Sequence, residues 1–153
     1  MTQAHHDVRV DRPIGEVFDF LAEGVNNPRW QPPVVRTAQA RGPLGAGTTF
    51  RQTVRHPLGF TVSADYRITV YDRPRQLAMV VTSGGPVRPT LTYTLTPAGD
   101  GATMVRCAVE YRPGGLGRLA APALALLHPL FAWEASWVDR ARELLEPAAR
   151  PAA

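Results

Sequence analysis

The segment LFAWEASWVDRARELLE, residues 130–146, is the element around which we expect the rest of the chain to be organised. Its apolar residues recur at steps of three and four, which places them on one face of a helix. That face comprises Leu130, Glu134, Trp137 or Val138, Ala141 and Leu145. Arg140, Arg142 and Glu143 fall mostly off it, as a solvated side requires. We predict an amphipathic helix here. Pro122 and Pro129 interrupt the apolar segment before it, so the start of the helix stays open.

The chain before Gly114 alternates apolar and polar residues instead, which is typical of β-strands. Turns rich in glycine and proline separate these segments and indicate an antiparallel meander. The cleanest alternation is in residues 60–70. One face of that strand is expected to carry Phe60, Val62, Ala64, Tyr66, Ile68 and Val70. The predicted strands are residues 4–10, 34–40, 48–56, 60–70, 77–81, 90–96 and 104–111. Their shared apolar face needs a cover, which the C-terminal helix can supply.

A short amphipathic helix is predicted after the first strand. We expect Asp11 to be its N-cap, with Pro13 near the first helical position, where a missing N–H costs little. Gly24 ends this helix, and residues 25–30 form a further helical turn before Pro32 and its neighbouring proline stop it. The buried face of the first helix comprises Val17, Phe18 and Leu21.

The composition is that of an ordinary globular domain: 153 residues, 44% hydrophobic and 20% charged, which we interpret as a single domain over residues 1–153. The net charge is +4 and every basic residue other than histidine is an arginine. The arginines are dispersed, without a dense basic block, which argues against a nucleic-acid partner. The absence of lysine excludes a side-chain Schiff base with a carbonyl substrate.

The common sequence patterns of cofactor and metal sites are missing. The single cysteine, Cys107, excludes an intrachain disulfide and a CxxC metal knuckle. His5 and His6 point opposite ways on a strand and make a poor metal site. A P-loop, a GxGxxG motif and a Ser/His/Asp arrangement are all missing. We expect neither a metal nor an organic cofactor.

The first residues lack the basic and apolar regions of a signal peptide, so we expect a cytoplasmic protein. The longest apolar run, Leu119–Trp133, is interrupted by prolines and is shorter than the ~20 residues that span a bilayer. We therefore expect no stable membrane insertion. A monomer and a homodimer both remain open.

Four segments of the chain resemble those of the SRPBCC superfamily (START, Bet v 1-like and polyketide cyclase/dehydrase-like proteins). They are DRPIGEVFDFLAEGVNNPRWQP (11–32), GPLGAGTTFRQ (42–52), YRITVYDRPRQL (66–77) and LTYTLTPAGDGATMV (91–105). The resemblance implies an α+β helix-grip fold. In this fold a curved antiparallel sheet of about six or seven strands wraps around a long C-terminal helix, with two short helices after the first strand.

The resemblance also implies a hollow between sheet and helix that accepts an apolar or aromatic small molecule. We expect the ligand-binding residues to be Trp30, Phe50, Gln52, Met79, Leu91, Cys107, Trp133 and Trp137. Tyr111 shares the same sheet face. By residue type alone, these side chains equally describe an ordinary filled core.

Glu134 is the most informative polar residue because it lies among Phe131, Trp133 and Trp137. A carboxyl group in such surroundings has a raised pKa and can act as an acid or a base. The alternative is a residue at the edge of the stripe that faces solvent or pairs with Arg106.

Tyr66 and Tyr93 are the other candidate catalytic residues, since inward hydroxyl groups can polarise a ligand carbonyl. Both are equally interpreted as amphipathic core residues, and Gln52 as a satisfied polar residue at a sheet end. Arg106 and Glu110 are predicted to be partners on the solvent side. His128 is either a gate or base at the cavity, or a surface loop residue.

Our first hypothesis is a cyclase or dehydratase, of lyase or isomerase type, that folds a flexible polyketide-like molecule inside the cavity. The second is a non-catalytic carrier or sensor of a lipid or quinone. The third is a membrane-surface role for residues 119–133, although this segment lacks the basic polar face usual for such helices.

Overall fold

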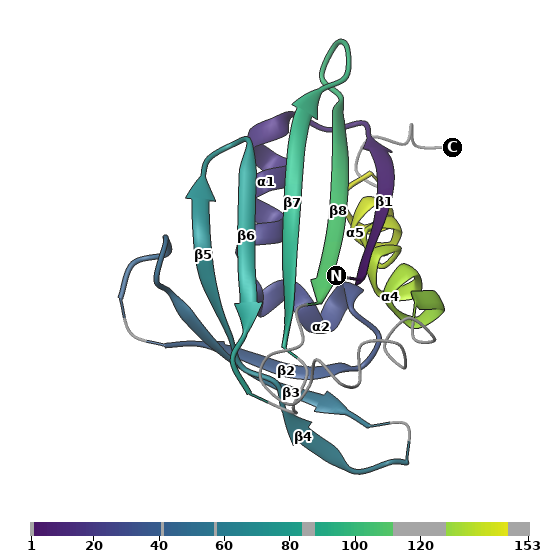
Figure 1. Cartoon of the computed structure of the whole chain (residues 1–153). Helices are drawn as coiled ribbons and strands as arrows, with labels where there is room; N and C mark the ends of the chain where they lie inside the picture. Colours follow the sequence, from purple (N-terminus) through teal and green to yellow (C-terminus); the bar gives the residue numbers. More distant parts are fainter. Residues whose placement is uncertain (1, 41, 57, 84–87, 112–127, 147–153) are drawn as a thin grey trace, which may run out of the picture.

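The computed structural model describes residues 2–40, 42–56, 58–83, 88–111 and 128–146 (Figure 1). The strands are β1 (Thr2–Val10), β2 (Val34–Gln39), β3 (Thr49–Arg55), β4 (Thr61–Ser63), β5 (Tyr66–Asp72), β6 (Gln76–Val81), β7 (Pro89–Pro97) and β8 (Thr103–Tyr111). The helices are α1 (Ile14–Ala22), the 3₁₀ turn η1 (Gly24–Asn26), α2 (Asn27–Trp30), α4 (His128–Ala135) and α5 (Val138–Leu145).

These strands form one antiparallel sheet in the order β1-β8-β7-β6-β5-β3-β2, with β4 paired to β3 alone. From β5 to β8, each strand pairs with the next in sequence, as short turns predict. Figure 1 shows α1 behind β6 and β7, and α4 and α5 beside β1. The predicted α+β architecture, a curved antiparallel sheet with a C-terminal helix and two short helices after the first strand, is confirmed.

The single strand predicted over residues 60–70 is wrong, because the segment forms two strands, β4 and β5. Asp65 interrupts the ladder: its carboxylate accepts a hydrogen bond from the Gln52 backbone N–H at 3.1 Å and from Ser63 Oγ at 3.0 Å. A side chain thus takes the place of the backbone acceptor that would pair with this β3 N–H group. This frees the β3–β4 hairpin to extend away from the rest of the sheet (Figure 1).

A β-bulge between Ile68 and Val70 also corrects the expected face of β5. Ile68 is buried, but Val70 is exposed and Tyr71 turns inward, with its ring 5.1 Å from that of Phe18 in an edge-to-face contact. An extra residue in one strand shifts the side-chain alternation by one position. The bulge therefore moves the inward face from even to odd residues.

Asp11 is not the N-cap of α1, which contradicts the expectation. Pro13 occupies that position, and no side chain caps the helix. The Asp11 carboxylate accepts a hydrogen bond from Arg9 Nε instead, and its backbone N–H donates to Glu146 Oε1 at 3.0 Å. Asp11 thus connects the end of β1 to the end of α5.

The predicted continuous helix over residues 130–146 is divided into α4 and α5 at Ser136 and Trp137. Ser136 Oγ donates to the Trp133 carbonyl at 2.6 Å, and the Trp137 N–H bonds the Glu134 carbonyl three residues back. A serine that bonds the preceding turn tightens and bends a helix locally. The predicted stripe remains: Val138 and Ala141 are each 1% exposed. The side chains of His128 and Leu130 lie outside the described residues.

The hydrophobic core fills the space between α1 and the sheet. Val17, Phe18 and Leu21 of α1 are at most 2% exposed, as are Leu77 and Leu95 of the strands beneath. Burial of this apolar surface supplies the main stabilising free energy of the domain. In the described part of the chain, no helix combines the length and apolarity needed to cross a bilayer.

Candidate ligand-binding site

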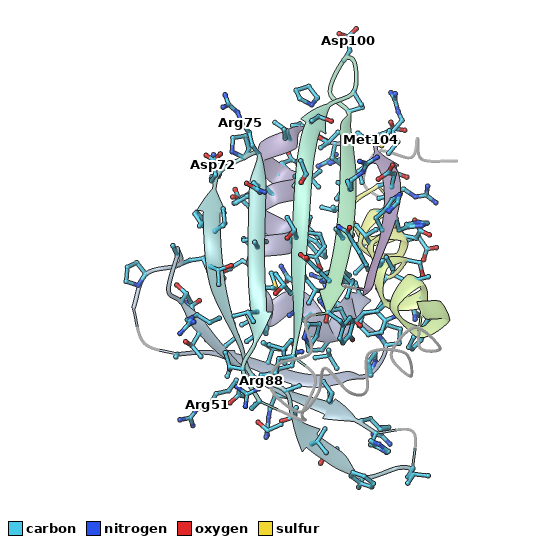
Figure 2. All side chains as sticks on the ribbon, viewed as in Figure 1. Arg51, Asp72, Arg75, Arg88, Asp100 and Met104 are labelled. Carbon is cyan, nitrogen blue, oxygen red and sulfur yellow. The ribbon has the colours of Figure 1, made fainter. Side chains whose placement is uncertain are left out.

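A cavity of about 620 Å³ lies at the end of the sheet that is opposite to the turn between β5 and β6. Its walls come from α2, β3, β5, β6, β7 and α4, with the turn of Pro32 and Pro33. Figure 2 shows the labelled Asp72, Arg75 and Asp100 at the end of the sheet opposite to Arg51 and Arg88. The lining is mostly apolar, and its polar and charged members are Asn27, Gln31, Gln52, Arg55, His56, Tyr66, Ser83 and Glu134.

Glu134 enters the cavity from α4 and is partly buried. Burial raises the pKa of its carboxyl group from about 4.5 to about 7, while a side-chain hydrogen bond with Tyr111 acts in the opposite direction. Arg106, the alternative partner, instead pairs with Asp7 on the outer surface at 2.8 and 3.0 Å. Near pH 7 the carboxyl group therefore exists in both protonation states, as a general acid or base requires.

Three buried, protonated side chains surround the carboxyl group from the sheet: Tyr93, Cys107 and Tyr111, at most 7% exposed. Burial raises the pKa of each, to about 12 for the Cys107 thiol, and the nearby Glu134 charge raises each further. Tyr93 and Cys107 also share a side-chain hydrogen bond. A thiol held neutral in this way is a poor nucleophile. These groups keep Glu134 in uncharged surroundings.

Asn27 organises a second polar group at the cavity wall. Its Nδ2 donates to Gln52 Oε1 and to the Tyr66 hydroxyl, both at 3.0 Å. Thr37 Oγ1 also donates to Gln52 Oε1, at 3.2 Å. Burial raises the pKa of Tyr66, so its hydroxyl group is neutral and its proton remains available for a ligand oxygen.

Gly24 allows Tyr66 to reach this position. A Cβ atom at Gly24 would overlap the Tyr66 hydroxyl and would come within 2.6 Å of the Phe50 ring. The rings of Phe50 and Tyr66 stack with centroids 5.0 Å apart. The absence of a side chain at Gly24 therefore leaves the space that the Tyr66 hydroxyl occupies.

The predicted site residues fall into two groups. Those that line the cavity are Gln52, Tyr66, Met79, Leu91, Trp133, Glu134 and Trp137. Those that lie in the surrounding core, outside the lining, are Trp30, Phe50, Tyr93 and Cys107. The rings of Trp30 and Tyr93 meet edge to face with centroids 6.3 Å apart, so this group supports the wall from behind.

Several lining residues were missed by sequence reasoning, above all Asn27 and Gln31 of the α2 segment and His56 of the β3–β4 hairpin. One signal was present: two amide residues four positions apart share a helix face, here directly before two prolines. His6, which we set aside as a metal ligand, bonds Asp139 Oδ1 at 3.0 Å. In the described residues, no cluster of His, Cys, Asp and Glu has the makeup of a metal site.

Residues 1–131 match the model of one protein family, described as polyketide cyclase/dehydrase and lipid transport. The chain belongs to this family. No curated protein matches the chain significantly.

Solved structures of this family's fold cover nearly the whole chain. A protein of Thermus thermophilus superposes with a TM-score of 0.74 at 16% identity, over 97% of this chain and 100% of its own. Norcoclaurine synthase of Thalictrum flavum gives 0.70 at 18% identity, over 97% and 96%. The di-domain ARO/CYC protein StfQ of the steffimycin biosynthetic pathway gives 0.73 at 16% identity, over 96% of this chain and 51% of its own. The expected SRPBCC membership and helix-grip fold are thereby confirmed.

Proposed function

We propose that this polyketide cyclase/dehydrase family protein encloses an apolar, carbonyl-bearing molecule and catalyses its cyclisation or dehydration. The observation that carries the proposal is Glu134, a carboxyl group with a pKa of about 7 in the wall of a largely apolar cavity. Such a group is suited to proton transfer at neutral pH. The cavity exceeds the size of a single aromatic ring and falls in the range of small-molecule sites.

In a dehydration, protonated Glu134 gives its proton to a departing hydroxyl group, which leaves as water. The resulting carboxylate takes up the proton lost from the neighbouring carbon as the double bond forms, which restores the starting state. Tyr66 and Gln52 are the candidates to hold the ligand carbonyl, because both line the cavity and are fixed by Asn27. We assign Tyr93 a positioning role behind Glu134.

The first experiment is native mass spectrometry of the purified protein, to identify a retained small molecule. The turnover of the identified molecule is then measured with the variant Glu134→Gln. Glutamine keeps the shape of the glutamate side chain but cannot transfer the proton. We expect kcat to fall by about 100-fold or more. The matched control is Glu143→Gln, on the exposed side of α5, which should retain wild-type turnover. Wild-type turnover in Glu134→Gln would contradict the proposal.

A non-catalytic carrier or sensor of a lipid or quinone is the second candidate. The family's description includes lipid transport, and only one acidic residue, Glu134, lines the cavity in the described part of the chain. A ligand recovered intact after long incubation, and bound equally by Glu134→Gln, would favour this function.

A further inference from the structure

Gln31 is a buried amide whose side chain has no protein partner in the described part of the chain. The residue is 8% exposed and lines the cavity. Its backbone is fully used: its N–H donates to the Asn27 carbonyl at 2.8 Å, and its carbonyl accepts from Val34 at 3.1 Å. Most polar side chains this deeply buried are hydrogen-bonded within folded proteins, so an amide without a protein partner calls for an explanation.

The Gln31 amide opens onto the cavity. Within the described residues, the polar side-chain atoms that are sealed from any open space and unpartnered belong to Trp30 and Trp137. The amide atoms of Gln31 are not among them, and the cavity is the space that the residue lines. A ligand in the cavity can therefore reach both its oxygen and its nitrogen.

Asn27 lies one helical turn before Gln31 and faces the same way. It is 3% exposed, and its Nδ2 is occupied by Gln52 and Tyr66. No hydrogen bond satisfies its Oδ1 among the described residues. Two neutral amides thus line the cavity: the described residues leave the oxygen atoms of both and the nitrogen of Gln31 unused, while the nitrogen of Asn27 is occupied.

The position of this pair is rigid. Trp30 is 2% exposed, and two prolines follow Gln31, which restrict its backbone. The ionisable lining residues come from other elements: Arg55 and His56 from the β3–β4 hairpin and Glu134 from α4. A neutral group loses less hydration than a charged one when it enters such a wall.

We infer that Asn27 and Gln31 form a subsite for an uncharged polar head group that both donates and accepts hydrogen bonds, such as a carboxamide or a hydroxy-ketone, while the apolar body of the ligand fills the rest of the cavity. This inference rests on the proposed function because it assigns part of the same cavity. It adds the chemical class of the head group and two residues that recognise it.

Three naphthalenes of nearly equal shape test the subsite by isothermal titration calorimetry: 2-naphthamide, 2-naphthoate and 2-isopropenylnaphthalene. The first is neutral and both donates and accepts, the second is charged, and the third is apolar. We expect the wild-type protein to bind 2-naphthamide about tenfold tighter than either of the others, the effect of two net hydrogen bonds.

The test variant is Gln31→Met, which keeps the length of the side chain and removes the amide. It should lower the preference for 2-naphthamide over 2-isopropenylnaphthalene to about threefold or less. The matched control is Gln39→Met on β2, whose amide bonds the Gly42 carbonyl outside the cavity and whose loss should leave the preference unchanged. Thermal unfolding of both variants verifies that they fold.

Equal affinity for the amide and the hydrocarbon, or an unchanged preference in Gln31→Met, would overturn the subsite and leave the cavity standing. Tighter binding of 2-naphthoate would overturn the neutral head group. Binding of none of the three probes would remove the cavity, and with it the proposed function. If Gln31→Met does not fold, the relative affinities of the wild-type protein for the three probes still decide whether the cavity prefers a neutral polar head group.

Discussion

The two ends of the sheet present the same alternation of side chains but enclose different interiors. At the end near the β5–β6 turn, Leu77 and Leu95 pack against α1 and are almost fully buried. At the other end, Met79 and Leu91 of the same two strands line the cavity. The strands continue unchanged from one end to the other, so the difference lies in the cover. A nine-residue helix fills the first end, whereas the four residues of α2 and the bent α4–α5 segment leave the second hollow.

The largest difference between the two ends is expected when one residue of β6 is truncated at each end. Leu77→Ala removes a side chain that is 0% exposed and should cost about 3 kcal/mol of unfolding free energy, because it leaves a new void. Met79→Ala should cost only about 1 kcal/mol, since its side chain already borders open space. Urea denaturation measures both. Equal losses would mean that the cavity end is as tightly filled as the other.

Gly24→Ala tests the packing at the border between the two ends of the sheet. Gly24→Ala should cost about 2 kcal/mol, because its Cβ would overlap the Tyr66 hydroxyl and the Phe50 ring. It should also weaken ligand binding by displacing Tyr66. Gly45→Ala is the matched control: a Cβ there meets nothing within 4 Å, and its stability should change little. A Gly24→Ala protein as stable as the control would show that Tyr66 moves freely.

The smallest expected effect is the change of the unfolding free energy with pH that Glu134 causes at the cavity end of the sheet. The pKa of Glu134 is about 4.5 when unfolded and about 7 when folded. Between these values the unfolded chain loses a proton that the folded chain retains, so the unfolding free energy falls as pH rises and levels off above about pH 7. We expect a loss on the order of 1 kcal/mol, because cavity water reaches the carboxyl group.

Glu134→Gln should abolish that part of the pH dependence, and urea titrations at pH 5 and pH 8 measure it. Glu143→Gln should retain the wild-type profile. If stability in Glu134→Gln still falls between these two pH values by the wild-type amount, the carboxyl group is not the one that titrates.

Much of the fold could be predicted from the sequence because periodicity reports which face of an element is buried. The strand containing Val105 follows this rule over its whole length, and the strand containing Leu91 follows it from Pro89 to Thr96. The rule fails where a single side chain changes the backbone pattern. Asp65 replaces a backbone acceptor and divides a strand, and Ser136 tightens a helical turn; neither effect changes the hydrophobic pattern.

The candidate site was harder to predict, for a different reason. Periodicity indicates that Phe50 and Tyr93 point inward, but whether they meet a ligand depends on what covers them. Trp30 covers Tyr93, and Tyr66 stacks on Phe50, so both lie behind the cavity wall. Asn27 and Gln31 lie at the two ends of a four-residue helix, where their spacing is the only sequence signal and the segment is too short for a hydrophobic repeat to indicate the buried side.

Because of the bulge in β5, the position of a residue along that strand determines which side of the sheet it faces as much as its hydrophobicity does. Tyr66, before the bulge, lines the cavity, and Tyr71, after it, contacts Phe18 of α1. Deleting one residue at the bulge would exchange inside for outside along the rest of the strand, without altering a single hydrophobic side chain. Insertions and deletions are therefore far less tolerable at this point of the chain than in its glycine-rich turns, and related sequences should keep the spacing between these two tyrosines.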